Sequence, residues 1–465
     1  MTTPFRFISL FSIVLLLITS CSPPAPVSEE AIQEEANVKT TPEWAKSANI
    51  YEVNVRQYTK EGTFKAFQEH LPRLEEMGVD ILWFMPVHPI GVKNRKGGLG
   101  SYYSVQDYKG INPEFGTLDD FKALVEDAHS RGMKVIIDWV ANHTAWDHKW
   151  VEAGHMDWYT LDSIGGLQPP IGTDWWDTAD LNYDNQDLRN EMIYDMQFWL
   201  RDVDLDGFRC DVAEWVPDEF WDQARAALDT VKPVFMLAEA EHVEHHVNAF
   251  DMSYAWEWHF VMNDLAQGTK GASDVVAYLE KEQRFPPSAY RLNMTSNHDE
   301  NTWKGTAGER LGDGVQTMAV MSATIFGMPL IYSGQEAALD HRLEFFEKDE
   351  IDWTEVPLKG FYTRLLENKH NNKALWNGED GAFPKVISST DDERVIAYER
   401  VKDGDAVVVL LNMSGEPRKV GLASVSMPGF YEELFTGAEM ELTDGYSEEL
   451  GPWNYRVYRV ENAVP

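Results

Sequence analysis

The chain has 465 residues, of which 43% are hydrophobic and 12% are aromatic, and its formal net charge at pH 7 is −37. This length gives room for one large domain and a smaller one, and the composition is that of a globular protein. The negative charge repels nucleic acid and anionic membrane surfaces, which argues against both as electrostatic partners. It is compatible with a neutral substrate but does not identify one.

The first residues have the pattern of an export signal. Arg6 supplies the positive end, residues 7–18 form an apolar core, and residues 17–21 read LITSC. This ending resembles a bacterial lipobox, in which the cysteine is lipidated after cleavage. An ordinary secretory signal or a membrane helix is the alternative, although the apolar run is short for a span. We therefore expect residues 1–21 to be a lipoprotein signal peptide, with lipidation at Cys21.

The segment that follows, residues 22–42, is rich in Pro, Glu, Ala and Thr and is predicted to be a flexible tether. A diacylated, N-acylated cysteine anchors firmly, so the membrane is an expected partner through this lipid anchor. The protein is then expected to be exported to the bacterial cell envelope, on the outer membrane or the periplasmic face. Only Cys210 remains after modification of Cys21, which leaves no pair for an intrachain disulfide.

From Trp44 onward, strand-like and helix-like segments alternate. Strands are expected at residues 50–55, 80–85, 134–140, 205–211, 234–239, 250–255, 291–296 and 329–333. Helices are expected at residues 63–77, 117–131, 188–201, 218–229, 272–283, 309–325 and 354–371. Eight such units predict a (β/α)8 TIM barrel over residues 43–371. No GxGxxG follows an early strand, which counts against a dinucleotide-binding doubly wound sheet.

Two regions depart from this alternation. Residues 142–186 contain clusters of Trp, Gly, Pro and Asp without clean periodicity, which predicts a short insertion, domain B, after the third strand. An insertion this short favours an open cleft over a deep exo-acting pocket. Residues 375–465 contain short alternating runs separated by turn residues, which predicts a C-terminal all-β sandwich domain.

Acidic residues end several of the predicted strands, where the active site of a (β/α)8 barrel lies. The third strand ends with Asp138, the fourth with Asp211, the fifth with Glu239 and the seventh with Asp299. Two carboxyl groups that flank a bond are the groups that cleave glycosides. Arg209 has the same strand parity as Asp211, so its guanidinium can hold that carboxylate ionised. Taken alone, the two residues are equally compatible with an ordinary ion pair.

Four short segments carry a resemblance to a known family. They read IDWVANH at residues 137–143, GFRCD at 207–211, LAE at 237–239 and SNHD at 296–299. Their order and spacing resemble the motifs of glycoside hydrolase family 13, the α-amylase family, and residues 327–336 resemble its eighth-strand signature. The resemblance covers the predicted barrel and the terminal β domain. It implies a retaining hydrolase of α-glucosidic bonds, mainly α-1,4, in starch-like polysaccharides or maltooligosaccharides.

The resemblance also implies the roles of three carboxylates. Asp211 would be the nucleophile that forms a β-glycosyl-enzyme intermediate, and Glu239 the general acid and then the general base. Asp299 would bind ring hydroxyls of the distorted sugar. Glu241 shares the strand parity of Glu239, so reasoning from the residues leaves it open as the acid, whereas the family motif selects Glu239.

Other matched positions are implied to bind the substrate. His143 and His298 match the family's histidines that hydrogen-bond the sugar before the cleaved bond, and Tyr103 matches the aromatic residue that stacks under it. The alternatives are structural histidines and core packing of the tyrosine. Asp138 is expected to support Arg209 and the histidines rather than to react.

The segment after the nucleophile differs from the family pattern. Many α-amylases have a Lys and a His there, and the His carbonyl binds calcium, but residues 212–215 of this chain read VAEW. Asn142 and Asp180 remain candidate calcium ligands because this ion prefers oxygen, and no organic cofactor is expected. The changed residues lie where leaving-group sugars would bind, so that side is expected to differ from typical starch-cleaving members. Three tryptophans are expected to line the cleft, with packing in the core or at the rim as the alternative for each: Trp175, Trp176 and Trp215.

Several other functions use the same residues. An α-glucosidase, a neopullulanase-like enzyme and a transglycosylase are alternatives within the family. A non-catalytic glucan-binding surface protein is the alternative from another class, but Asp211, Glu239 and Asp299 are all present, which favours an enzyme. An aldolase or isomerase would require a Schiff-base lysine or a phosphate loop at a strand end, and the sequence offers neither.

Overall fold

The computed structural model describes Met1 and residues 39–461. The predicted signal peptide with Cys21 and most of the predicted tether lie outside the described residues. The last tether residues, 39–42, pack against the barrel, because the Thr41 hydroxyl donates to Asp251 at 2.6 Å and Arg225 donates to the Thr40 carbonyl at 2.9 Å. In the described part of the chain, no helix is both long and apolar enough to cross a membrane.

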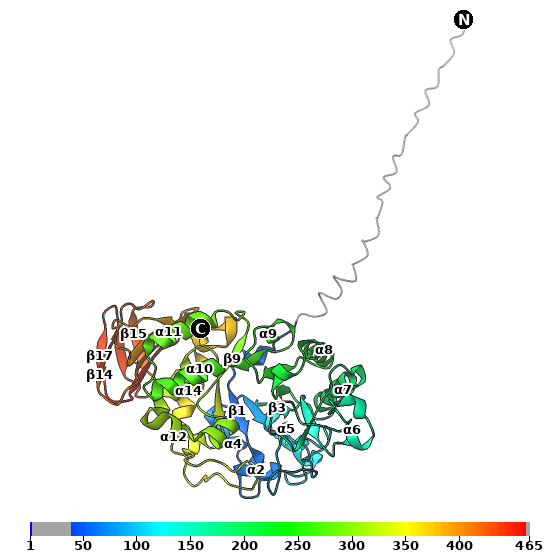
Figure 1. Ribbon diagram of the computed structural model, residues 1–465. Helices are drawn as coiled ribbons and strands as arrows, with labels where there is room; N and C mark the ends of the chain where they lie inside the picture. Colours follow the sequence, from blue (N-terminus) through cyan, green and yellow to red (C-terminus); the bar gives the residue numbers. More distant parts are fainter. Residues whose placement is uncertain (2–38, 462–465) are drawn as a thin grey trace. The chain divides into compact units, whose positions relative to one another are not determined.

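A closed barrel of eight parallel strands forms the centre of residues 39–461 (Figure 1). Around the barrel the strands follow the order β1-β10-β9-β8-β7-β6-β3-β2, and β2 pairs with β1 again. The strands are β1 (Ile50–Val53), β2 (Ile81–Phe84), β3 (Lys134–Trp139), β6 (Gly207–Cys210), β7 (Phe235–Ala238), β8 (Met252–Tyr254), β9 (Tyr290–Met294) and β10 (Met328–Tyr332). This topology confirms the predicted (β/α)8 barrel.

Helices connect the strands and cover the barrel. They are α2 (Val55–Tyr58), α3 (Phe64–Gln68), α4 (Leu71–Met77), α5 (Leu118–Ser130), α7 (Gln186–Asp202), α8 (Asp218–Asp229), α9 (His245–Asn248), α10 (Trp256–Ala266), α11 (Ala272–Glu282), α12 (Ala307–Leu311), α13 (Val315–Thr324) and α14 (Lys359–Asn371). The short helical turns are η1 (Glu43–Ala45), η3 (Ala213–Trp215), η4 (Glu300–Lys304), η5 (Gly312–Gly314), η6 (Gln335–Ala337), η7 (Lys373–Leu375) and η8 (Gly378–Asp380).

The helices depart from the sequence prediction in three places. The segment expected as one helix at 63–77 is two helices, because Pro72 has no N–H and is placed in the first turn of α4. The segment at 309–325 is divided by η5, where Gly312 has a φ of +55°. Helix α10 was not predicted, because a segment such as Trp256-Glu257-Trp258 has too little polar periodicity to mark one face.

The predicted insertion, residues 142–186, contains a two-stranded antiparallel sheet of β4 (His143–Ala145) and β5 (Thr178–Asp180). Between these strands lie α6 (Lys149–Glu152) and η2 (Met156–Trp158). Because β4 begins soon after β3 ends, the insertion stands at the C-terminal end of the barrel.

The C-terminal part is an antiparallel β domain with a core of its own (orange to red in Figure 1). A six-stranded sheet has the order β11-β12-β13-β18-β15-β16, and β14 pairs with β17. These strands are β11 (Lys385–Val386), β12 (Val395–Lys402), β13 (Asp405–Asn412), β14 (Arg418–Gly421), β15 (Gly429–Glu433), β16 (Glu439–Leu442), β17 (Ser447–Leu450) and β18 (Tyr455–Val460). The all-β C-terminal domain predicted from the sequence is confirmed.

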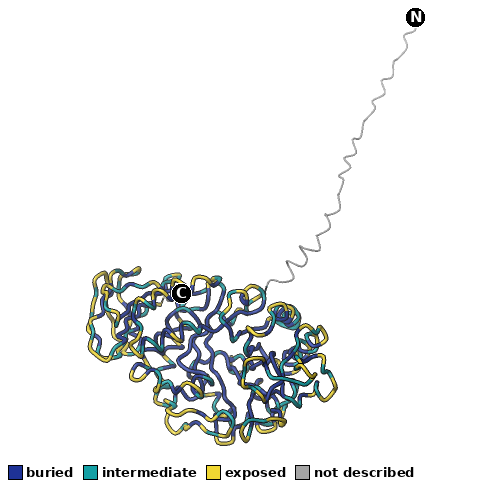
Figure 2. Tube along the Cα trace, in the orientation of Figure 1, coloured by how far each residue is buried: buried dark blue, intermediate teal, exposed yellow. Residues whose placement is uncertain are grey.

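Buried side chains join the two parts, and Figure 2 shows that the buried interior runs through the barrel strands. Arg400 on β12 is almost fully buried and donates to the carbonyls of Ile325 at 2.9 Å and of Trp376 at 3.1 Å. A buried guanidinium that is hydrogen-bonded to carbonyls on both sides fixes the domain against α13.

Candidate active site

Arg209 on β6 is the centre of an ion cluster at the mouth of the barrel. Its Nη1 lies 2.8 Å from Asp138 Oδ1 and 2.9 Å from Asp211 Oδ1, and its Nη2 lies 2.9 Å from Glu239 Oε2. The acids come from the ends of the adjacent strands β3, β6 and β7. Arg209 is fully buried, and burying a charge is costly unless opposite charges compensate it. The fold therefore brings three predicted carboxylates onto one guanidinium.

Burial and neighbouring negative charge raise the pKa values of Asp138 and Asp211, whereas the guanidinium of Arg209 lowers them. Burial raises the pKa of Asp138 to about 6, although Arg209 lowers it. Burial and the neighbouring Glu239 raise the pKa of Asp211 well above its ordinary value, again against Arg209. Arg209 is thus only one of the influences on the ionisation of Asp211. Asp211 and Glu239 thus crowd two acidic groups around one guanidinium, and this crowding contributes to the raised pKa of Asp211.

His298 follows β9 and connects Glu52 with Tyr103. Its Nδ1 lies 2.5 Å from Glu52 Oε1, and its Nε2 lies 2.7 Å from the Tyr103 hydroxyl and 3.4 Å from Asp299 Oδ2. Burial lowers the pKa of His298, but Asp299 and Glu52 outweigh it and raise the pKa to about 9. The Tyr103 hydroxyl donates to Asp138 at 3.0 Å. The histidine is therefore a cation at neutral pH and joins the cluster around Arg209 through Tyr103 and Asp138.

A cavity of about 850 Å³ opens in front of this cluster. The carboxylates of Asp211, Glu239 and Asp299 line it together, as do Tyr103 and His143. The other three expected residues lie outside the lining and are almost fully buried: Asp138, Arg209 and His298. The remaining walls include the cationic and aromatic side chains Arg95, Lys96, Trp175, Trp176, Trp303, Phe345 and Phe346. A concave site with aromatic walls and converging carboxylates is suited to a polar ligand with apolar faces.

Several aromatic rings line the cavity or pack against its wall. The Tyr103 ring stacks on His298, with ring centroids 5.5 Å apart and an interplanar angle of 19°. Trp175 lies 5.4 Å from the His143 ring and stacks on Trp215 at 5.3 Å. Burial lowers the pKa of His143 to about 3, so its ring is neutral and has one donor and one acceptor nitrogen. Trp176 also lines the cavity and is 58% exposed.

A smaller cavity of about 410 Å³ shares Val212 and Glu239 with the larger one. Val212, Glu214 and Trp215 line it, and Glu214 lies 3.2 Å from His242. The segment whose sequence departs from the family pattern therefore borders the smaller cavity, and its first residue, Val212, lines both cavities.

Glu241, the alternative acid, is turned toward other partners. Its Oε1 accepts from Arg291 at 2.5 Å, and its Oε2 accepts from the Glu257 N–H at 2.9 Å. It lines the smaller cavity only, whereas Glu239 lines both. The Val212 N–H donates to Glu239 Oε2 at 2.8 Å. This geometry favours Glu239 over Glu241 as the acid.

Among the residues that sequence reasoning missed, Glu52 and Trp303 directly contact predicted residues of the site. Glu52 on β1 is fully buried beside His298, and an acid inside an otherwise apolar strand was the available signal. Trp303 donates from Nε1 to Asp299 Oδ1 at 3.0 Å, and the sequence has no signal for that contact.

The predicted calcium ligands lie close together in the insertion. The Leu181 N–H donates to the Asn142 carbonyl at 3.1 Å, and Asp180 pairs with His143 across β4 and β5. Burial raises the pKa of Asp180, and no Lys, Arg or His in the described part of the chain forms an ion pair with it. Calcium takes about six to eight oxygen ligands. The described residues contain no group of three acidic, His or Cys side chains suited to a metal, so the pair supplies only part of such a shell.

Comparison with known proteins agrees with the geometry. Residues 36–164 and 171–394 match the model of the alpha-amylase catalytic domain. Alpha-amylase MalA of Haloarcula japonica is 30% identical over 399 residues, which is 82% of this chain and 57% of MalA. The chain therefore spans less than two thirds of that relative. Neopullulanase 2 of Thermoactinomyces vulgaris is 25% identical over 478 residues, which covers 90% of this chain and 79% of the neopullulanase.

Among solved structures, the maltogenic alpha-amylase AmyB from Thermotoga neapolitana has a TM-score of 0.81 and 28% sequence identity. The similarity covers 90% of this chain and all of the AmyB chain. The family model matches most of the chain, and the eight strands that the family requires carry the acids at their C-terminal ends. The chain belongs to the alpha-amylase family of glycoside hydrolases.

Proposed function

We propose that this protein is a retaining α-glucan hydrolase that cleaves mainly α-1,4 bonds in starch-like polysaccharides or maltooligosaccharides. The observation that carries the proposal is the single cavity lined by Asp211, Glu239 and Asp299, with Arg209 in contact with the first two. Membership of the family and the similarity to MalA and Neopullulanase 2 support it.

The proposed reaction has two steps. Asp211 attacks the anomeric carbon while Glu239 donates a proton to the leaving oxygen, so the glycosidic bond breaks and a β-glycosyl ester forms. Glu239 then takes a proton from water, which attacks the same carbon and releases Asp211. Each step inverts the anomeric centre, and the product therefore keeps the α configuration. Asp299 accepts hydrogen bonds from ring hydroxyls as positive charge develops on the sugar.

Arg209 is suited to both states of this reaction. The first step requires an ionised Asp211 and a protonated Glu239, and Arg209 opposes the burial that raises the pKa of Asp211. In the ester Asp211 carries no charge, and Glu239 has given up its proton. Because the guanidinium contacts both carboxyl groups at 2.9 Å, its charge compensates whichever one is negative. The N–H of Val212 holds Glu239 through both steps.

The neighbouring residues bind the sugar whose bond is cleaved. The Tyr103 ring stacks against its apolar face, and His143, which lines the cavity, hydrogen-bonds its hydroxyls. His298 lies behind the lining and acts through its contacts with Tyr103 and Asp299. His298 also attracts Asp299, whose Oδ2 lies 3.4 Å from Nε2. Asp138 positions Arg209 and Tyr103 and does not react.

The choice of acceptor separates the alternatives. An α-glucosidase, a neopullulanase-like enzyme and a transglycosylase use the same three carboxylates and differ in what occupies the leaving-group side. We propose that the leaving-group side is the smaller cavity, which Glu239 lines together with Val212 and Trp215. A non-catalytic glucan-binding protein would not need three carboxylates around one cavity.

The test is product analysis over time on starch, pullulan and maltooligosaccharides, with the anomeric configuration recorded by NMR. We expect α-configured products, and β-configured products would rule out the retaining mechanism. Asp211→Asn should lose hydrolysis by several orders of magnitude while the fold and oligosaccharide binding persist. Asp204→Asn, an exposed Asp outside the mouth, is the matched control. Full activity of Asp211→Asn would refute the assignment of the nucleophile.

We also propose a lipid anchor at Cys21, exposure of the enzyme on the bacterial cell envelope, and a calcium ion held by Asn142 and Asp180. The lipobox-like ending supports the anchor. The half-buried carboxylate of Asp180, which lacks a cationic partner in the described part of the chain, supports the calcium ion. Such an ion would hold the insertion to the barrel and would take no part in bond cleavage.

A further inference from the structure

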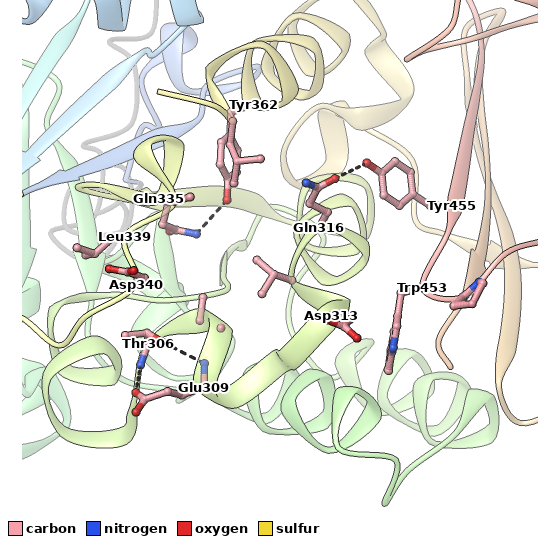
Figure 3. Close-up of a pocket in the computed structure, with 16 residues that line it drawn as sticks. Thr306, Glu309, Asp313, Gln316, Gln335, Leu339, Asp340, Tyr362, Trp453 and Tyr455 are labelled. Atoms are coloured by element: carbon pink, nitrogen blue, oxygen red, sulfur yellow. Dashed lines mark hydrogen bonds between the residues drawn. The ribbon is translucent and has the colours of Figure 1, made fainter. Parts of the chain in front are cut away.

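A second cavity, of about 910 Å³, lies between the barrel and the C-terminal domain (Figure 3). Its barrel walls come from α12, the start of α13 and η6, and its C-terminal wall contains Trp453 and Tyr455. No residue that lines it also lines the active-site cavity. The reaction described above makes no use of this cavity.

Two aromatic rings are fixed on the C-terminal side of the cavity. The backbone N–H of Trp453 donates to the Ser414 carbonyl at 2.8 Å, and the Trp453 carbonyl accepts from the Thr317 hydroxyl at 2.5 Å. The indole lies against Gly314, where an added Cβ would be 2.9 Å from Cε3. One part of the indole is therefore packed against the barrel, while the ring still lines the cavity.

The second ring is held by a side chain on the barrel. The Tyr455 hydroxyl donates to Gln316 Oε1 at 3.0 Å, and Figure 3 shows the phenol directed toward that amide across the domain boundary. Both aromatic residues are partly exposed. Rigid rings that are packed in part and open in part are surfaces on which the apolar face of a sugar can stack.

The charged groups of the cavity are all carboxylates, which accept hydrogen bonds. Asp313, Gln316 and Asp340 are exposed, and the described residues that line the cavity include no Lys, Arg or His. The chain as a whole has a net charge of −37. This distribution repels phosphates, nucleic acid and acidic peptides. A neutral ligand rich in hydroxyl groups can instead donate hydrogen bonds to the carboxylates while it stacks on the rings.

Two chain segments connect this cavity with the active site. In the first, Asp299 and Trp303 line the active-site cavity, and Thr306 and Glu309 line the second one. In the other, residues 335–340 contribute to the second cavity and residues 345–346 to the first.

Hydrogen bonds join the two segments between the cavities. The Leu343 N–H donates to Asn301 Oδ1 at 2.9 Å, and the Thr302 hydroxyl donates to the Leu343 carbonyl at 3.0 Å. A ligand in the second cavity therefore contacts the same segments that position Asp299 and Trp303. This continuity favours a ligand of the same class as the substrate of the active site.

We propose that the second cavity binds an α-glucan chain, with Trp453 and Tyr455 as stacking residues and Asp313, Gln316 and Asp340 as hydrogen-bond partners. The ligand class rests on the proposed function. The site would retain a long glucan next to the active site and would matter little for a short oligosaccharide that fits the active-site cavity alone.

The test blocks the cavity without removing any of its contacts. Gly308 on α12 lines it, and a Cβ there would meet nothing closer than Thr306 Oγ1 at 3.7 Å, so Gly308→Arg fills the cavity with little strain. Gly360 on α14 is also an open helical position but lies outside the lining, and Gly360→Arg is the matched control. Trp453→Ala is a second variant that removes a stacking ring.

Binding to insoluble starch is measured in the Asp211→Asn background, where turnover is prevented, and hydrolysis of starch and of maltotriose is measured with Asp211 intact. Loss of one stacking contact corresponds to roughly three- to tenfold weaker binding. We expect this loss for Gly308→Arg and Trp453→Ala, with starch hydrolysis reduced and maltotriose hydrolysis unchanged.

Equal starch binding by Gly308→Arg and Gly360→Arg would overturn the inference even if Trp453→Ala failed to fold. That result leaves the proposed function intact as long as the parent enzyme hydrolyses starch. Failure of the parent enzyme to hydrolyse any α-glucan would instead refute the proposed function, and with it the ligand of the second cavity.

Discussion

Replacement of Glu52 by Gln tests the charge state of the histidine behind the active-site cavity. Glu52 Oε1 lies 2.5 Å from His298 Nδ1, and both side chains are almost fully buried. The pKa of His298 rises from its ordinary 6.5 to about 9, which corresponds to about 3 kcal/mol of preference for the charged form. Gln keeps an oxygen that can accept from Nδ1–H but removes the negative charge.

The expected result follows from the remaining influences on His298. Burial lowers its pKa, and Asp299 is the largest influence that still opposes burial once Glu52 is neutral. At pH 8, a pKa of about 9 leaves roughly nine tenths of the histidine charged, whereas a return to the ordinary value leaves less than about a tenth. Neutral His298 cannot donate from both nitrogens, so its contact with Asp299 is lost. The alkaline limb of kcat/KM should therefore move at least about one pH unit lower.

The stability of the fold gives an independent readout. Because the folded-state pKa of His298 is raised, its stabilising contribution is complete below pH 6.5 and is lost as the pH rises through about 9. Urea unfolding at pH 6.5 and 9 should show a larger decrease for the wild-type protein than for Glu52→Gln. Glu75→Gln, which neutralises an exposed Glu paired with Arg131, is the control. Coincident alkaline limbs in wild type and Glu52→Gln would refute the proposed charge of His298.

Three further predictions address the barrel, the calcium ion and the anchor. Gly207→Ala should destabilise the fold by about 3 kcal/mol or more, because the new Cβ would lie 1.9 Å from the Phe235 carbonyl. Gly360→Ala, at an open helical position, should instead stabilise it by about 0.5–1 kcal/mol. Equal unfolding midpoints for the two variants would contradict this prediction. EDTA should lower the Tm and added calcium should restore it, and Asp180→Asn should abolish that response. Cys21→Ser should move the enzyme from the membrane fraction to the soluble fraction of the producing cells.

The parts of the fold that follow from local pattern were predictable from the sequence. The barrel strands are short apolar runs buried on both faces, so their positions could be read directly, and β2 and β7 are fully buried throughout. Helix α5 was marked at its start by the Thr117 and Asp120 capping box, which is present in the structure. Local signals of this kind do not need knowledge of the partner.

Contacts between distant segments were not predictable in this way. Glu52 and His298 are 246 positions apart, and only the closure of the barrel brings β1 and β9 to either side of β10. The second cavity likewise depends on how Trp453 packs on Gly314, a contact between the two domains. The sequence predicted which acids stand at strand ends, and it also pointed to Tyr103, Trp175 and Trp176 at the cleft. It did not identify the aromatic residues of the opposite segments, Trp303, Phe345 and Phe346.

The residue after the proposed nucleophile shows how local strain and site geometry are linked. Val212 has a φ of +37°, which is unfavourable for a β-branched side chain and costs of order 1–3 kcal/mol. This conformation ends β6 abruptly and turns the Val212 N–H toward Glu239 Oε2, so adjacent residues hold the nucleophile and the acid in one arrangement. The departure from the family pattern begins at this valine. The altered leaving-group side is therefore built on the same strained turn that orients the proposed catalytic pair, and changes there should affect acceptor choice and rate together.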